Sequence, residues 1–111
     1  MSISTHVLDA VAGAPAREVA VHLERVDGSE TVEIARAGTD TDGRCPALTD
    51  GLRLETGTYQ LRFETGAYFA ATGTATFYPV VLLAFEVTDA SAHYHVPLLL
   101  SPFAYSTYRG S

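Results

Sequence analysis

Hydrophobic and polar residues alternate with a period of two along several segments of this chain. Val19, Val21 and Leu23, for example, alternate with Ala20, His22 and Glu24. This period is typical of strands with one buried face, because successive side chains of a strand point to opposite sides. The pattern predicts strands at 19–24, 31–34, 59–64, 81–87 and 94–100, with shorter strands at 3–8 and 103–108.

Turn residues separate these segments. Residues 26–29 (Val-Asp-Gly-Ser) predict a hairpin, residues 39–43 (Thr-Asp-Thr-Asp-Gly) predict a turn capped by aspartate side chains, and Gly51 and Gly57 suit loops with positive φ. Residues 66–73, bracketed by glycines, predict one short helix. With no repeat or linker, we expect a single domain over 1–111: an all-β sandwich of two antiparallel sheets with one short helix.

The composition narrows the possible partners. The chain has 13 acidic and 7 basic residues, a formal charge of -6 and no lysine, so nucleic-acid binding is not expected. The longest apolar run, 79–85, is too short to span a bilayer, and the first residues show no basic or apolar leader. We therefore expect no membrane association and a cytoplasmic location.

Cys45 is the only cysteine, which excludes a disulfide within the chain and fits a reducing compartment. Its neighbours Arg44 and Pro46 leave a reactive thiol open as an alternative. A small packed side chain is the interpretation we prefer for Cys45.

The predicted faces of the strands place polar groups on the outside of the sandwich. If Tyr94, Val96, Leu98 and Leu100 face the core, then His93, His95, Pro97 and Leu99 point outward.

The two terminal strands follow the same rule. We expect Ile3 and Val7 to face inward and His6 and Leu8 outward. At the other end, Phe103, Tyr105 and Thr107 should face the core, and Ala104, Ser106 and Tyr108 should face outward. His6, His93, His95 and Tyr108 would then share outer surfaces with apolar residues, which suggests that a second copy of the chain covers them.

Other interpretations of the histidines remain open. Strand histidines are commonly solvated or hydrogen-bonded without a further role, and His22, isolated from the others, is set aside on this ground. His6, His93 and His95 could also form a three-histidine zinc site, although no carboxylate or cysteine obviously supports one.

Three segments resemble, in order, the signatures of the 5-hydroxyisourate hydrolases, the transthyretin-related proteins of purine catabolism. They are residues 4–9 (Ser-Thr-His-Val-Leu-Asp), 40–44 (Asp-Thr-Asp-Gly-Arg) and 93–111, which starts His-Tyr-His-Val-Pro and ends Tyr-Arg-Gly-Ser. The resemblance spans almost the whole chain, and its last segment is the most specific. Transthyretin is similar in layout but lacks these histidines and the terminal tetrapeptide.

The resemblance implies a transthyretin-like sandwich that forms a homotetramer, a dimer of dimers, with active sites between subunits. It implies hydrolysis of 5-hydroxyisourate to 2-oxo-4-hydroxy-4-carboxy-5-ureidoimidazoline in urate degradation. No cofactor or metal is expected.

The resemblance also assigns roles to residues. It implies that His6, Arg44, His95 and Ser111 are catalytic and that His6, Arg44, Tyr108, Arg109 and Gly110 bind the substrate. Either His6 or His95 could be the general base, because imidazole titrates close to neutral pH. Arg44 suits bidentate recognition of the ring edge, Arg109 could pair with a carboxylate to fix the tail, and His93 is expected to play a supporting part.

Two rival functions differ in their expectations. A transthyretin-like carrier of aromatic small molecules would bind ligands between subunits without turning them over. A structural or adhesion sandwich would leave its outward histidines freely exposed and titrating normally.

Overall fold

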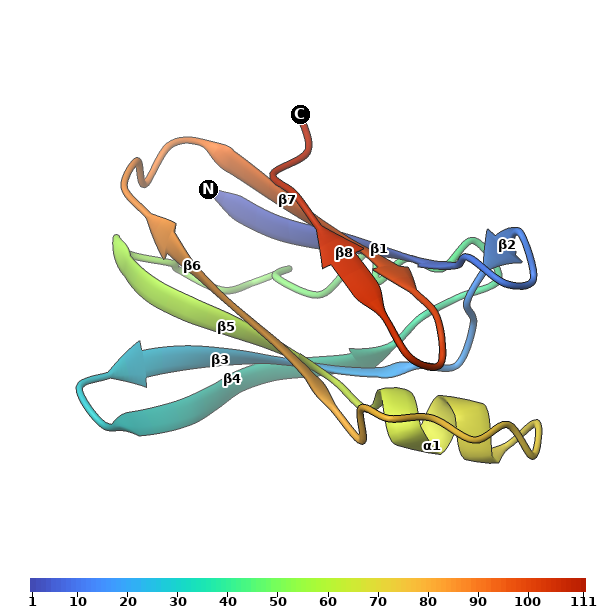
Figure 1. Cartoon of the computed structure of the whole chain (residues 1–111). Helices are drawn as coiled ribbons and strands as arrows, with labels where there is room; N and C mark the ends of the chain where they lie inside the picture. The colour runs from blue at the N-terminus through green and yellow to red at the C-terminus, as the bar shows by residue number, and fades with distance from the viewer.

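The computed structural model describes residues 1–111 and contains two four-stranded sheets and one helix (Figure 1). In chain order the elements are β1 (Ser2–Asp9), β2 (Ala14–Pro15), β3 (Ala20–Asp27), β4 (Glu30–Gly38), β5 (Gly57–Phe63), α1 (Thr65–Ala70), β6 (Val81–Val87), β7 (His93–Leu100) and β8 (Tyr105–Thr107). All the predicted strands occur, and β2 is a short addition that the alternation did not reveal. The all-β, two-sheet sandwich with one short helix is confirmed.

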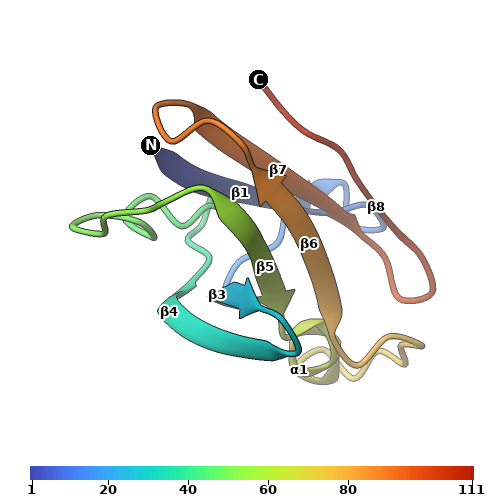
Figure 2. The ribbon, with the colours of Figure 1, turned by 90° about the vertical axis from the view of Figure 1, so that its left-hand side faces the viewer.

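The strand order is β4-β3-β5-β6 in one sheet and β2-β1-β7-β8 in the other. Figure 2 shows the two sheets as separate layers, with both chain termini beside β7. The first sheet is antiparallel throughout, but β1 and β7 pair in parallel from Ser2↔His93 to Asp9↔Leu100. This one pairing departs from the antiparallel arrangement expected, because alternation reports which face a residue occupies and not the direction of its neighbour.

The core lies between the sheets and is filled by the inward sides of the predicted strands. Ile3 and Val7 from β1 and Tyr94, Val96, Leu98 and Leu100 from β7 are buried, as predicted. They meet Val21 and Leu23 of β3 and Tyr59, Leu61 and Phe63 of β5 across the interface. Burial of these apolar side chains is the main force that holds the two layers together.

The helix α1 begins one residue before the predicted segment and ends at Ala70, with a turn up to Gly73. Phe69 is buried against the core, and the Tyr68 hydroxyl donates a hydrogen bond to the Asp9 carboxylate at 2.8 Å. Burial and this carboxylate raise the pKa of Tyr68 to about 12. The contact ties the helix to the end of β1. This helix is neither long nor apolar enough to cross a membrane.

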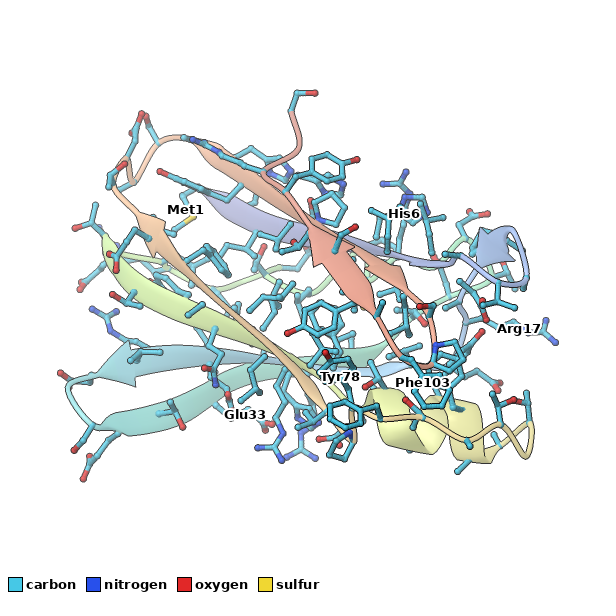
Figure 3. The ribbon with its side chains drawn as sticks, in the orientation of Figure 1. Met1, His6, Arg17, Glu33, Tyr78 and Phe103 are labelled. Carbon is cyan, nitrogen blue, oxygen red and sulfur yellow. The ribbon has the colours of Figure 1, made fainter.

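The C-terminal strand departs from its predicted form. β8 covers only three residues, and Phe103 and Tyr105 are 66% and 39% exposed rather than buried. The prediction that Phe103, Tyr105 and Thr107 face the core was therefore wrong in burial, because β8 is the outermost strand of its sheet and a cavity lies between it and β6 of the opposite sheet. The loop carrying Phe103 lies at the α1 end of the molecule (Figure 3).

Candidate active site

The parallel pairing of β1 with β7 gathers the polar residues on the outer face of their sheet. Ser4 lies opposite His95, Ser2 lies opposite His93, and His6 follows on β1, level with Pro97. Figure 3 shows His6 on the outer side of this sheet, away from the sheet that contains β3 and β4. The prediction that His6, His93 and His95 face outward is confirmed. Pro97 also faces outward but is buried, because the C-terminal segment covers it.

Hydrogen bonds join the two serines to the two histidines of β7. The Ser4 hydroxyl oxygen lies 2.7 Å from Nδ1 of His95 and 2.9 Å from Nε2 of His93, and the Ser2 hydroxyl bonds Nδ1 of His93. The rings of His93 and His95 stack with their centroids 6.5 Å apart. His95 is half-buried, whereas His93 is exposed.

Arg44 is held beside His6 by the predicted aspartate-capped turn. The Asp40 carboxylate accepts hydrogen bonds from the backbone N–H groups of Asp42 and Arg44 at 2.9 and 3.0 Å. The turn then docks on β1, where Val7 N–H donates to the Gly43 carbonyl at 2.8 Å and Arg44 forms a bridge with His6. Residues 38 positions apart in sequence thus become neighbours.

Gly43 makes this close approach possible. Its φ is +76°, and a Cβ there would lie 2.4 Å from the Val7 carbonyl oxygen and 3.3 Å from Cδ2 of His6. A larger residue would both strain the turn and push it away from His6.

The C-terminal tail approaches His95 in a similar way. Gly110 N–H donates to the His95 carbonyl at 2.8 Å, and the Thr107 hydroxyl donates to the Pro97 carbonyl at 2.7 Å. A Cβ on Gly110 would lie 2.5 Å from Cδ2 of His95, so only glycine fits against the ring. Ser111, next to Gly110, is exposed at the chain end.

In the single chain, Tyr108 and Arg109 lie in a different cavity from the one that Arg44 and His93 line. Both line a cavity of about 530 Å³ between β6 and β8, together with Leu83, Phe85 and Tyr94. The Arg109 guanidinium lies 4.4 Å from the centre of the Tyr94 ring and forms no ion pair, so the expectation of a carboxylate partner was wrong. The aromatic face of Tyr94 holds the guanidinium instead.

The electrostatics of the outer face favour a neutral His95. Burial lowers the pKa of His95 below its usual 6.5, and the nearby positive charges of Arg44, His93 and His6 lower it further. The unfolded chain therefore binds this proton at a higher pH than the folded chain does. The contribution of His95 to the free energy of unfolding thus falls as the pH drops below 6.5.

Arg44 carries an uncompensated charge. Its side chain is exposed and forms no ion pair with any carboxylate of the chain. With Ser2, Ser4 and His93 it lines a largely polar cavity of about 360 Å³. An unpaired guanidinium beside a neutral imidazole can bind an oxygen-rich planar group while the imidazole accepts a proton.

The structure joins His6, Arg44, His95 and Gly110 in one place and adds two residues that the sequence analysis missed, Ser2 and Ser4. Their signal was present in the sequence, because Ser2, Ser4 and His6 occupy the same face of the first strand. Their partners on β7 depended on a pairing that alternation does not specify.

The structure also bears on His22, Cys45 and the possible metal site. His22 pairs with Glu33 at 2.5 Å on the other sheet, which supports setting it aside. Cys45 is 4% exposed, and burial raises the pKa of its thiol to about 11, so it is a packed side chain rather than a reactive thiol. The histidine, cysteine and acidic side chains form no group of three or more with a geometry suited to a metal ion.

The half-burial of His95 and its lowered pKa disagree with the freely titrating histidines expected of an adhesion sandwich.

Comparisons with known proteins identify the family and agree with the fold. The HIUase/Transthyretin family matches residues 3–110. The 5-hydroxyisourate hydrolase of Ralstonia nicotianae is 46% identical over 98% of this chain and 97% of its own length. Among solved structures, Klebsiella pneumoniae 5-hydroxyisourate hydrolase has a TM-score of 0.83 at 38% identity, covering 98% of this chain and 92% of its own. Sea bream transthyretin in complex with thyroxine has a TM-score of 0.91 at 32% identity, covering 97% and 93%.

We predict that the His95 ring titrates below pH 6.5 and that its midpoint rises in Arg44→Gln, because a repelling positive charge is removed. Nitrogen-15 NMR of histidine-labelled protein would follow the ring through the titration. A His95 midpoint at or above pH 6.5 that is unchanged in Arg44→Gln would contradict the electrostatic account of this site.

Proposed function

Because this chain belongs to the HIUase/Transthyretin family, we propose that it hydrolyses 5-hydroxyisourate at a site formed by His6, Arg44 and His95. The relative named 5-hydroxyisourate hydrolase in Ralstonia nicotianae is 46% identical to this chain, and the one in Mus musculus is 41% identical. The activity is therefore that of a hydrolase in urate degradation. The observation that carries the site assignment is the convergence of these side chains through two backbone bridges, His6↔Arg44 and His95↔Gly110.

The reaction opens a ring at a cyclic amide. A water oxygen forms a bond to the ring carbonyl carbon, and one water proton passes to a base. The carbon–nitrogen bond then breaks and the leaving nitrogen takes up a proton, which gives a carboxylate and a ureido group. The product is 2-oxo-4-hydroxy-4-carboxy-5-ureidoimidazoline. The chemistry requires a base near neutrality, a proton donor and stabilisation of the negative charge on oxygen.

We assign the base to His95. Its lowered pKa leaves the imidazole neutral at physiological pH, and the Ser4 contact at Nδ1 leaves Nε2 available for water. His6, on the neighbouring strand, then holds the water or protonates the leaving nitrogen.

Arg44 orients the substrate and stabilises the developing oxyanion. Its planar fork matches a heterocycle edged with carbonyl and N–H groups, and no internal carboxylate competes for it. The protein as a whole has a formal charge of -6, so this guanidinium with the neighbouring histidines supplies the local positive charge that a urate-like substrate needs.

The tail closes one side of the site. Gly110 lies against the His95 ring, and the Ser111 hydroxyl and terminal carboxylate follow directly. Arg109, stacked on Tyr94, anchors the tail in this position. Tyr108 is 60% exposed and, with Arg109, lines the cavity between β6 and β8. We therefore propose that any contact of Tyr108 or Arg109 with substrate occurs in the assembled protein.

We propose that the assembly is a homotetramer, a dimer of dimers, with substrate sites between subunits. β6 and β8 are the outermost strands of their sheets and leave backbone hydrogen-bonding groups unpaired, and Leu82, Tyr105 and Tyr108 are exposed beside them. A second copy adding strands to these edges would cover the cavity between them. The exposed outer face that bears His93 and Arg44 then remains for contact between dimers.

A carrier function on the same fold is the second candidate. The high TM-score to sea bream transthyretin in complex with thyroxine favours it at the level of the fold. The unpaired Arg44 and the neutral, half-buried His95 favour hydrolysis, since a channel for apolar ligands gains nothing from either.

The first prediction concerns the activity. 5-Hydroxyisourate generated freshly from urate by urate oxidase should lose its ultraviolet absorbance faster with the protein than without it. His95→Ala and His6→Ala should each lower the rate by about a hundred- to ten-thousandfold, because each removes a proton-transfer group.

His22→Ala is the matched control, since this histidine lies on the other sheet, and it should keep the wild-type rate. If either site variant retained more than half the activity, its assignment would be wrong. An inactive wild-type protein that binds aromatic ligands would favour the carrier.

The second prediction concerns the assembly. Sedimentation equilibrium should give four times the 11.9 kDa of one chain. A monodisperse monomer at assay concentrations that is fully active would rule out sites shared between subunits.

The third prediction concerns location. A single, buried and unpaired cysteine needs no oxidising compartment, so we propose that the protein resides in the cytoplasm. Fractionation of the source cells should recover it with cytoplasmic markers, and recovery with a secreted fraction would contradict this.

A further inference from the structure

The Ser4 hydroxyl lies between two imidazole rings. Its oxygen is 2.7 Å from Nδ1 of His95 and 2.9 Å from Nε2 of His93, and both distances are those of hydrogen bonds. A hydroxyl carries one hydrogen, so Ser4 can donate to only one ring and must accept from the other.

This single hydrogen couples the tautomers of the two rings. If His95 carries its proton on Nδ1 and donates to Ser4, then Ser4 donates to a bare Nε2 of His93, and His93 donates from Nδ1 to Ser2. If the chain of bonds runs in reverse, His95 carries its proton on Nε2 instead. Only the first direction leaves Nε2 of His95 with a free lone pair.

We propose that Ser4 and His93 are positioning residues that hold His95 in its Nδ1–H form, so that Nε2 can accept the proton of the attacking water. The proposal rests on the proposed hydrolysis, which needs an unprotonated nitrogen at this position. When Nε2 takes the water proton, the Nδ1–H bond to Ser4 becomes charge-assisted and stabilises the imidazolium.

Protonation of His93 reverses this arrangement. A protonated ring has N–H on both nitrogens, so Nε2 of His93 must donate to Ser4, and Ser4 must turn its hydrogen toward Nδ1 of His95. His95 then holds its own proton on Nε2 and cannot act as a base. His93 is exposed, so solvent protons have direct access to its ring.

The charged and titratable groups around this pair come from four segments. His6 lies on β1, His93 and His95 lie on β7, and Arg44, Cys45 and Asp50 line a cavity with His93 from the loop between β4 and β5. The fourth segment is the C-terminal tail, where Gly110 lies against the His95 ring and the terminal carboxylate of Ser111 follows. Burial raises the pKa of the Cys45 thiol to about 11, so this thiol is protonated near neutral pH. Among the neutral-range groups, His93 is the one that shares a hydroxyl with His95.

Ser4→Ala tests the link directly. It removes the hydroxyl without a large change in volume, so kcat should fall about ten- to a hundredfold while KM changes little, as is common when a partner that orients a histidine is lost. Ser4→Thr restores a hydroxyl on a residue that suits a strand and should recover most of the turnover. Ser29→Ala, in the exposed β3–β4 turn, is the control and should behave as wild type.

His93→Gln tests the effect of pH. Glutamine can accept from Ser4 but does not titrate, so the acid side of the plot of log kcat/KM against pH should lose a slope of one proton. His22→Gln, which removes a histidine from the other sheet, should leave the profile unchanged.

Nitrogen-15 NMR of the His95 ring supplies a readout that does not depend on turnover. The wild-type protein at neutral pH should carry hydrogen on Nδ1 and none on Nε2, and Ser4→Ala should lose this preference. Hydrogen on Nε2 of wild-type His95 would overturn the proposal, as would full kcat in Ser4→Ala. A wild-type protein that does not speed the decay of 5-hydroxyisourate would overturn the proposed function and the catalytic part of this inference, and the tautomer would then be decided by the NMR spectrum alone.

Discussion

The parallel pairing of β1 with β7 is the constraint on which the site depends. It sets Ser4 opposite His95 and Ser2 opposite His93, and it brings His6 into the same row of outward side chains. A shift of this register by one residue would turn the histidines of β7 or the serines of β1 toward the opposite face. The buried side chains of the same strands fix the register, because Ile3, Val7, Val96 and Leu98 have to fill the space between the sheets. Packing of the core therefore fixes the positions of the serines and histidines on the outer face of the sheet.

Two glycines complete the site by letting backbone come close to the histidines. Gly43 brings the Arg44 turn against His6, and Gly110 brings the tail against His95. The absence of a side chain at Gly43 and Gly110 leaves room for a backbone hydrogen bond to the sheet. Gly43 bonds Val7 of β1, and Gly110 bonds His95 of β7. The guanidinium of Arg44 and the chain end thus reach the sheet from distant parts of the sequence without long side-chain contacts of their own.

The electrostatic state of the site follows from what the fold leaves unpaired. Burial of His95 favours its neutral form, and the charge of Arg44, which has no carboxylate partner, favours it further. His22 shows the contrast, because this histidine lies on the other sheet and its Nδ1 is hydrogen-bonded to the Glu33 carboxylate. The same residue type is thus available for proton transfer in one sheet and structural in the other, depending on the neighbours that each sheet supplies.

The sequence by itself determined all the strands except β2, the buried faces of all the predicted strands except β8, and the outward direction of His6, His93 and His95, because a period of two is a local property that each strand carries alone. Its motifs also identified Arg44 and the terminal Tyr-Arg-Gly-Ser segment as candidates. Only the tertiary structure decided that β1 and β7 run parallel, that Ser2 and Ser4 bond the two histidines, and that Arg109 stacks on Tyr94. It also decided that Phe103 and Tyr105 stay exposed in the single chain. These outcomes depend on which strands become neighbours and which remain at an edge, and such relations between distant segments leave no periodic signal within any one of them.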